Sequence, residues 1–416
     1  MSKTATRWTD GSMQVRVAKR YAAERRFKLL GLAAVGLSCA FLAFLLVTMM
    51  AKGLSGFTRT DARVTIDFAR SDVMLDPAAL KGAQGKQAIA SADLESPLGA
   101  AAMAQYGEQA AELFGAAAAR ELGRELLRDP SLLTGQAELW LPVSSDVDVA
   151  AKGDGDEESE RLVRALEAKN GVKRSFNPDF LTASDATDPS VVGVWGALKG
   201  SFLTILVTMA LAFPIGVLAA LYLEEFAPRN RWTDLIEVSI NNLAAVPSII
   251  FGLLGLAVFL NFMHLPRSAP LVGGLTLALM TMPVIVIAGR NAIKSVPPSI
   301  RDAALGVGAS KMQVVFHHVL PLALPGILTG TIIGMARALG ETAPLLMIGM
   351  RAFIASPPQG ITEPASVLPV QIFLWSDEVD RAFVEKTSAA IIVLLIFMLL
   401  MNGLAIYLRN RFERRW

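Results

Sequence analysis

The sequence has very few of the residues that build disulfide bonds and metal centres. Its 416 residues include one cysteine, Cys39, and three histidines, His264, His317 and His318. A single cysteine excludes an intrachain disulfide and a cysteine-based metal site. Three histidines do not favour a His-rich metal centre. We therefore predict that the chain holds no metal ion.

Charge is also scarce. Only 18% of the residues are charged, whereas 53% are hydrophobic and the mean hydropathy is +0.46. Several apolar runs reach the length of about 20 residues that a helix needs to cross a bilayer. The chain is therefore predicted to be an integral membrane protein.

Six apolar runs predict six transmembrane helices. The first follows a basic flank and is longer than the core of a signal peptide, so we interpret it as a retained anchor. The runs predict an all-α polytopic membrane protein with spans at residues 29–50, 200–223, 240–262, 271–288, 322–349 and 388–408.

The distribution of charge predicts the topology. Residues 1–28 carry eight Lys/Arg against two acidic residues, and residues 409–416 carry four Arg against one Glu. The connector 290–311 is also basic, whereas residues 351–387 carry three basic and five acidic residues. By the positive-inside rule, we expect a multi-pass protein of the cytoplasmic (inner) membrane with cytoplasmic N- and C-termini.

Residues 51–195 form a long polar segment between the first two spans. The segment carries 15 Lys/Arg against 23 Asp/Glu, so it has no basic footprint for nucleic acid. Two stretches alternate apolar and polar residues as half-buried strands do, and 97–128 has a helical composition. We predict an inserted extracytoplasmic α+β domain whose alternating apolar positions are Val64, Ile66, Phe68, Leu139, Leu141 and Val143.

Residues 153–158 of this segment have the sequence Gly-Asp-Gly-Asp-Glu-Glu. The spacing of an EF-hand calcium loop is absent, which favours a solvated acidic loop.

Small, hydroxyl and proline residues recur within the spans. Ser201, Thr204 and Thr208 share one helical face. One interpretation is close packing of helices, which small residues allow. The other is a set of broken or kinked helices beside a transport pathway. The prolines concerned are Pro214, Pro247, Pro283 and Pro344.

The polar stretch 297–321 between two spans predicts two short helices that meet at an elbow. Pro297 and Pro298 suit the start of a helix, because proline lacks an N–H and presets φ. Gly308 can adopt the left-handed conformation that ends a helix. Ser310 with Gln313 predicts a capping box that opens the second helix. Such an elbow is a docking knob for another protein.

The same stretch resembles the coupling loop of ABC importer permeases. The matching residues are Asp302-Ala303-Ala304, Gly308 and Leu320-Pro321. Asp302 replaces the usual glutamate, and His318 stands at a packing position where the family prefers an aliphatic residue. The resemblance implies that the elbow docks into a groove on a nucleotide-hydrolysing subunit and transmits its closure.

The chain lacks a phosphate-binding loop of its own. Residues 306–311 superficially resemble one, but the Gly-x-x-x-x-Gly-Lys-Ser/Thr string that cradles nucleotide phosphates does not occur. We predict that the chain is not an enzyme, has no catalytic residue and holds no cofactor. ATP would be used by partner subunits.

Arg337 and Glu341 lie four residues apart inside an apolar run, where a charge is costly and faces a partner or a water-filled path. They could form a packed ion pair between helices. Alternatively, they could bind an anion, because a guanidinium matches an oxyanion. A nearby carboxylate can accept a hydrogen bond from phosphate, which carries a proton at neutral pH, but repels sulfate, which does not.

Residues 332–346, with Arg337-Ala-Leu-Gly-Glu341-Thr342-Ala-Pro, resemble the A-type permease of the bacterial phosphate-specific ABC importer. The resemblance covers about 196–410 and implies a type I permease core whose pathway includes Arg337, Glu341 and Thr342. It also implies a second homologous permease, two ATP-binding subunits and a periplasmic phosphate-binding protein as partners, with inorganic phosphate as substrate.

These observations predict a domain order with a cytoplasmic segment 1–28, a first span 29–50, an extracytoplasmic domain 51–195, a core 196–410 and a cytoplasmic tail 411–416. Three other functions stay open. The chain could be an ABC permease for sulfate, molybdate or phosphonate. It could also be a membrane receptor with an extracytoplasmic sensor domain, or a channel or ion-driven transporter.

Overall fold

The computed structural model describes residues 11–69, 75, 77–80, 82, 85–351 and 353–412. These residues divide into two compact units, one ending at Lys52 and one beginning at Gly53. Some basic residues of the predicted N-terminal segment, among them Lys3 and Arg7, lie outside the described residues. Most of the predicted tail 411–416 does too.

The predicted first span belongs to one long helix, α1 (Gly11–Gly56, 46 residues). At a rise of 1.5 Å per residue, this helix is about 69 Å long. It begins well before residue 29 because the basic flank contains good helix formers and no glycine or proline after Gly11. One ion pair, between Lys28 and Glu24 (2.6 Å), also supports the flank.

The polar segment contains a three-stranded antiparallel sheet with the order β2-β1-β3. Val64 pairs with Leu139, and Thr60 pairs with Arg174. Alternate side chains face the hydrophobic core, as the sequence predicted for Val64 and for its neighbours along the strand. The strands are β1 (Thr58–Asp67), β2 (Gln136–Pro142) and β3 (Val172–Phe176).

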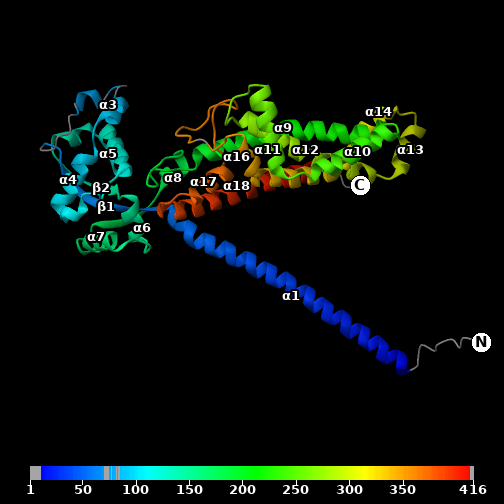
Figure 1. Ribbon diagram of the computed structural model, residues 1–416, viewed down its shortest axis with the longest axis horizontal. Helices are drawn as coiled ribbons and strands as arrows, with labels where there is room; N and C mark the ends of the chain where they lie inside the picture. Colours follow the sequence, from blue (N-terminus) through cyan, green and yellow to red (C-terminus); the bar gives the residue numbers. More distant parts are fainter. Residues whose placement is uncertain are drawn as a thin grey trace, which may run out of the picture. The chain divides into compact units, whose positions relative to one another are not determined.

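Short helices cover this sheet, with α4 against β1 and α5 against β2 (Figure 1). The predicted helical stretch 97–128 is two α-helices with a break at Gly107, whose φ is +98°. The helices of the segment are α2 (Pro77–Leu80), α3 (Gly85–Ser91), α4 (Glu95–Tyr106), η1 (Glu108–Ala110), α5 (Ala116–Arg128), η2 (Pro130–Thr134), α6 (Ser145–Ala151), α7 (Glu157–Ala168) and α8 (Pro178–Thr182).

The predicted acidic loop is correct only for residues 153–156, because Glu157 and Glu158 form the first turn of α7. The Asp156 carboxylate accepts a hydrogen bond from the Ser159 N–H and so caps this helix. Hydrogen bonds from Ser159 lower the pKa of Asp156, because they favour its charged form.

Five described helices are long and apolar enough to cross a membrane, and a bent pair of helices brings the number to as many as six. Four of the five follow the polar segment: α9 with the π-helical η3, α12, α15 with its preceding turns, and α18. The bounds in this region are α9 (Trp195–Leu221), η3 (Tyr222–Phe226), α10 (Arg231–Ala244), α11 (Ser248–Gly255), η4 (Leu256–Phe262), α12 (Pro270–Lys294), α13 (Pro298–Gly306), α14 (Lys311–Gln313), η5 (Val314–Val319), α15 (Leu320–Gly340), α16 (Ala343–Met347), α17 (Leu368–Ser376) and α18 (Ala382–Phe412).

Two predicted spans are not continuous helices. The predicted span 240–262 crosses a bend of 101° between α10 and α11. Pro247, which lacks an N–H and restricts the residue before it, lies at this break. The predicted span 322–349 is interrupted after Gly340, where Glu341 is extended and Pro344 lies in the first turn of α16. By contrast, α9 and α12 run through Pro214 and Pro283 without a break.

Small residues let three membrane helices pack closely, with side chains of one helix against the glycines of the next. Helix α12 contacts both α9 and α15. A Cβ added to Gly274 of α12 would lie 2.5 Å from Val207 of α9, and one on Gly334 of α15 would lie 2.9 Å from Thr281. Ser201, Thr204 and Thr208 are buried, and the Thr208 hydroxyl donates to the carbonyl of residue 204 (2.8 Å). These three residues therefore serve close helix packing.

Candidate functional site

The elbow predicted at 297–321 forms as its local sequence indicates. Pro298 begins α13, and Gly308 follows this helix with a left-handed φ of +89°. The Ser310 hydroxyl accepts from the Gln313 backbone N–H, while the side-chain amide oxygen of Gln313 accepts from the Ser310 backbone N–H. The capping box opens α14, which continues through the π-helical η5 into α15. The elbow is thus joined to a membrane helix without a loop.

The elbow presents apolar side chains to its surroundings. Asp302, Ala303 and Gly308 are exposed, whereas Ala304 is buried in a core formed with α9 and α12. Leu320 and Pro321 lie half-buried in the first turn of α15. The large exposed apolar residues of the elbow are Leu305, Val307 (86% exposed), Met312 and Phe316. Such an apolar patch is typical of a surface that another protein covers.

His318 does not occupy a packing position within this chain, contrary to the sequence-based expectation. The side chain is exposed, and its neighbour Val319 is fully buried instead. The π-helical turn of η5 adds one residue to the turn and so shifts which side chains face the core. His318, which replaces the family's aliphatic residue, therefore lies on the outer face of the elbow.

Glu225 of η3, which directly follows α9, fastens the elbow, and the sequence analysis did not identify it. The Arg301 guanidinium of α13 donates to Glu225 (2.7 Å) and to the carbonyl oxygens of Val296 (2.7 Å) and Ile293 (3.0 Å). Arg301 therefore caps the end of α12 and ties α13 to α9 at the same time. The available signal was the Glu-Glu pair that ends an apolar run, opposite a basic connector.

A second cluster lies beside the first. Arg290 of α12 donates to Glu224 (2.5 Å) and pairs with Glu237 of α10 (2.6 Å), and Lys294 lies 3.4 Å from Glu224. Lys311 also lies over the Phe226 ring, 5.1 Å from its centroid. Arg301 and Lys311 therefore hold the elbow on η3 and on the end of α12, while Arg290 ties α12 to η3 and to α10.

The predicted anion-binding residues lie at the opposite end of α15. Arg337 is in the last turn of the helix, and Glu341 is the residue directly after it. The two side chains approach to only 3.5 Å and are 44% and 19% exposed. Met335 and Leu339, on the other face of the same turn, pack into a buried core. Arg337 therefore lies on an open face of a membrane helix.

Thr342 completes this group, because it is half-buried and immediately precedes α16. The break after Gly340 brings Arg337, Glu341 and Thr342 to one corner, where two helix ends meet. The elbow residues lie at the other end of the same helix, so the two predicted groups are joined by α15 but do not form a single site. Among the described residues, no three His, Cys, Asp or Glu side chains gather as metal ligands would.

Comparisons with known proteins match both parts of the chain. Residues 212–416 match the family model of the binding-protein-dependent transport system inner membrane component. Residues 14–161 match a model described as a domain of unknown function (DUF3333). The chain is 33% identical over 217 residues to the probable ABC transporter permease protein YqgI of Bacillus subtilis, covering 49% of this chain and 72% of that protein.

A second relative is the phosphate transport system permease protein PstA of Yersinia pestis. It is 32% identical over 214 residues, which cover 51% of this chain and 71% of that protein. The chain belongs to the family of PstA-like ABC transporter permeases. The structure also matches in part a solved chain of the MetNI methionine ABC transporter. The match has a TM-score of 0.43 and 19% identity, and it covers 53% of this chain and 98% of that chain.

Family membership establishes several of the predictions. The permease is a multi-pass, mainly helical component of the inner membrane with an inserted α+β segment, and it is a transport subunit rather than a nucleotide-hydrolysing one. As an ABC transporter permease of a binding-protein-dependent transport system, it works with ATPase and binding-protein partners. Membership decides against the receptor and channel interpretations.

Proposed function

We propose that the permease carries inorganic phosphate through the inner membrane, with Arg337, Glu341 and Thr342 on the pathway. The observation that carries this proposal is the open position of Arg337 on an apolar membrane helix, where its ion pair within the described part of the chain is a long contact to Glu341 (3.5 Å). An uncompensated cation in the hydrocarbon layer is costly. A water-filled path that admits an anion accounts for its position.

The chemistry of the corner favours phosphate over other oxyanions. Arg337 offers a planar set of donors that matches two oxygens of a tetrahedral anion. Glu341 lies on the same corner and can accept a hydrogen bond only from an anion that keeps a proton. Phosphate keeps a proton at neutral pH and sulfate does not. The similarity to the Yersinia pestis phosphate permease supports the same substrate.

The proposed assembly follows from the elbow and the charge distribution. Both termini would lie in the cytoplasm, and residues 51–195 would lie in the periplasm. The elbow would dock on one of two ATP-binding subunits through the exposed side chains around Val307. The remaining partners are a second homologous permease and a periplasmic phosphate-binding protein. The proposed functional segments keep the predicted limits 1–28, 29–50, 51–195, 196–410 and 411–416.

Radiolabelled phosphate uptake tests this function in cells that lack the chain and in the same cells carrying it again. We expect uptake to depend on the chain and to resist competition by excess sulfate or molybdate. Uptake that is equal with and without the chain would refute the function. Strong competition by sulfate would favour the second candidate, a permease for another oxyanion.

A further inference from the structure

The α+β segment and the helical core have separate hydrophobic cores. The first lies within residues 62–166 and surrounds the sheet. The second joins Phe180 of α8 to the beginning of α9, to α17 and to the first turns of α18. We call the second group the base. Two clusters of charged side chains connect the segment to the base.

The first cluster, joint 1, centres on Lys152, which follows α6. Its ammonium group pairs with Asp148 (2.7 Å), with Glu385 of α18 (2.9 Å) and with the carbonyl oxygen of Thr58 (2.9 Å). Lys386 pairs with the same Glu385 (3.2 Å). The Lys152 and Glu385 side chains are only 7% and 12% exposed. Joint 1 thus links α6 and β1 to the start of α18 by buried charges.

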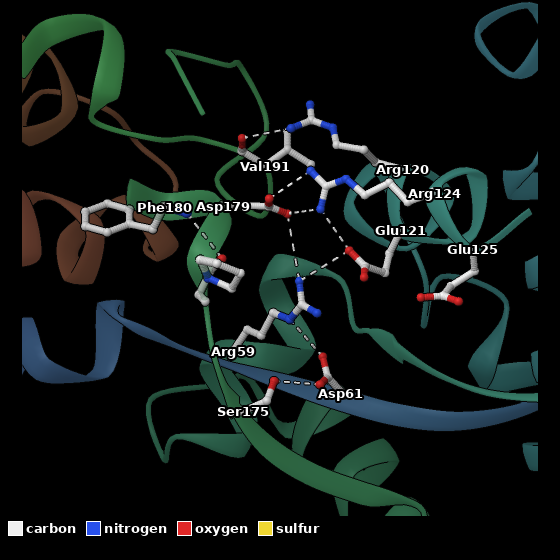
Figure 2. A network of polar contacts seen from close by, with 12 residues as sticks. Arg59, Asp61, Arg120, Glu121, Arg124, Glu125, Ser175, Asp179, Phe180 and Val191 are labelled. Atoms are coloured by element: carbon white, nitrogen blue, oxygen red, sulfur yellow. Dashed lines mark hydrogen bonds and ion pairs between the residues drawn. The ribbon is translucent and has the colours of Figure 1, made fainter. Parts of the chain in front are cut away.

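The second cluster, joint 2, appears in Figure 2. Arg124 of α5 makes two hydrogen bonds to Asp179 of α8 (2.8 and 3.0 Å). Arg59 of β1 lies between Asp179 (3.8 Å), Glu121 (3.7 Å) and Asp61 (3.1 Å). The Asp179 hydrogen bonds raise the pKa of Arg124, whereas burial raises the pKa of Asp61. Joint 2 links α5 and β1 to α8.

Ion pairs such as these, in which Lys152 and Asp179 are 7% and 16% exposed and Arg124 is 47% exposed, fix an orientation more than they add stability. Desolvation offsets much of their attraction, so an apolar contact of equal size would serve stability as well. An apolar contact tolerates sliding, however, whereas paired charges lose their partners when the surfaces shift. Both joints have the composition of a contact that must keep one geometry.

The base connects both joints to the candidate pathway. Helix α18 packs against α15, where Met401 and Phe397 contact the core that contains Leu339. Leu339 lies two residues from Arg337 on the opposite face of that turn. The start of α9 is held to α17 by the hydrogen bond from the Leu368 N–H to the Ser201 hydroxyl (2.8 Å). A body fastened to the base therefore constrains α9 and α18 together.

We propose that the α+β segment is a rigid clamp that holds the beginnings of α9 and α18 in one geometry during transport. Joints 1 and 2 are the positioning contacts of this clamp. Its role in uptake rests on the proposed function, whereas its rigidity does not. Movement driven from the elbow then displaces α15 against a fixed α18.

Distances between spin labels in the assembled complex test the clamp. The single native thiol is removed by Cys39→Ala, and labels are placed at Glu167→Cys on α7 and Phe373→Cys on α17, both exposed positions. We expect one narrow distance distribution in the parent protein. Arg124→Gln and Lys152→Met should each broaden it, and the double variant should broaden it most.

Arg128→Gln is the matched control, because Arg128 lies one turn after Arg124, is 81% exposed and pairs only with its helix neighbour Glu125. It should keep the narrow distribution and full uptake. The double variant should lose uptake by about tenfold while the complex still assembles and hydrolyses ATP.

A broad distribution of spin-label distances in the parent protein would refute the proposed clamp. A narrow distribution in the double variant would refute it too. Broadening with full uptake would overturn its role in transport. If phosphate is not the substrate, the parent shows no phosphate uptake, but its distance distribution stays narrow. The two proposals therefore fail in different ways.

Discussion

Two arginine–glutamate pairs lie at opposite ends of the path from the elbow through α15, and they differ in construction. Arg301 and Glu225 are 23% and 10% exposed, 2.7 Å apart, and Arg301 also donates to two backbone carbonyls. Arg337 and Glu341 make one contact of 3.5 Å, and Arg337 is 44% exposed. The first pair has its hydrogen-bonding capacity largely filled within the chain. The second keeps donors available for a third group.

The difference teaches how one type of ion pair serves two purposes. A guanidinium with filled donors fixes a geometry, because any displacement breaks several hydrogen bonds together. A guanidinium held loosely by one distant carboxylate can bind an anion without first breaking strong contacts. The comparison supports our proposal that the corner pair contacts the substrate, and it predicts that the elbow pair transmits force.

The largest effect is expected from Arg337→Ala. Loss of a bidentate, charge-assisted contact of roughly 3 kcal/mol or more predicts a fall in phosphate uptake of about 100-fold. Assembly should be intact, because the Arg337 side chain is 44% exposed and its ion pair with Glu341 is long (3.5 Å). Uptake in vesicles, together with co-purification of the complex, measures both effects.

Two variants control this prediction. Arg337→Lys keeps the charge but loses the planar fork, and it should recover only part of the uptake. Arg351→Ala removes another exposed arginine beyond the corner and should leave uptake unchanged. Normal uptake by Arg337→Ala would remove Arg337 from the pathway.

Gly308→Asp is expected to uncouple ATP hydrolysis from transport. A side chain meets open space here, but the φ of +89° is unfavourable for any residue with a Cβ, by about 1–2 kcal/mol. The new charge also lies on the exposed elbow. We expect uptake per ATP hydrolysed to fall by about 30-fold in the reconstituted complex, because the backbone strain at residue 308 and the new charge together weaken docking.

Gly306→Asp separates the two causes, because Gly306 lies in open space nearby but has no positive φ. A smaller loss of coupling than in Gly308→Asp would assign the difference to the backbone. Unchanged coupling in Gly308→Asp would contradict docking through the elbow.

Glu225→Gln tests the fastening of the elbow. Arg301 would keep its two carbonyl acceptors, so we expect a moderate loss, about fivefold in uptake per ATP with a lower melting temperature of the complex. Asp234→Asn, on an exposed carboxylate of α10, is the matched control. If both the melting temperature and the uptake per ATP hydrolysed are unchanged in Glu225→Gln, the pair does not hold the elbow.

The smallest effect is expected from Glu341→Gln, which removes the repulsive charge but keeps an acceptor oxygen. Phosphate uptake should change little, while competition by sulfate should strengthen by about threefold. The inhibition constants of sulfate in wild-type and variant vesicles measure the change. Equal constants would separate Glu341 from selectivity.

Local features were predictable from sequence, and long-range contacts were not. The elbow formed as expected because proline, Gly308 and the Ser310–Gln313 box each act within a few residues. The corner residues were proposed from the cost of charge inside an apolar run, and their place on the pathway stays a prediction. Hydropathy alone, however, does not show whether the helix axis changes direction. The bend at Pro247 was therefore not visible within one continuous apolar run.

Apart from the Glu-Glu pair that ends an apolar run, the contacts that fasten the parts together left no pattern in the sequence. Glu225 and Arg301 lie 76 residues apart, and Lys152 and Glu385 lie 233 apart. Each residue alone resembles an ordinary surface charge at the end of a helix. Only the fold shows that they meet, and only burial distinguishes them from solvated pairs.

The glycine contacts among α9, α12 and α15 determine how the core responds to the lipid around it. Gly274 and Gly334 let the side chains of Val207 and Thr281 lie close against the backbones of α12 and α15, so the three helices cannot approach further without steric conflict. A bilayer thicker or thinner than the apolar core must then be met by tilting the three helices as one body. Membrane thickness would thereby tilt α15 and change the depth at which the corner lies.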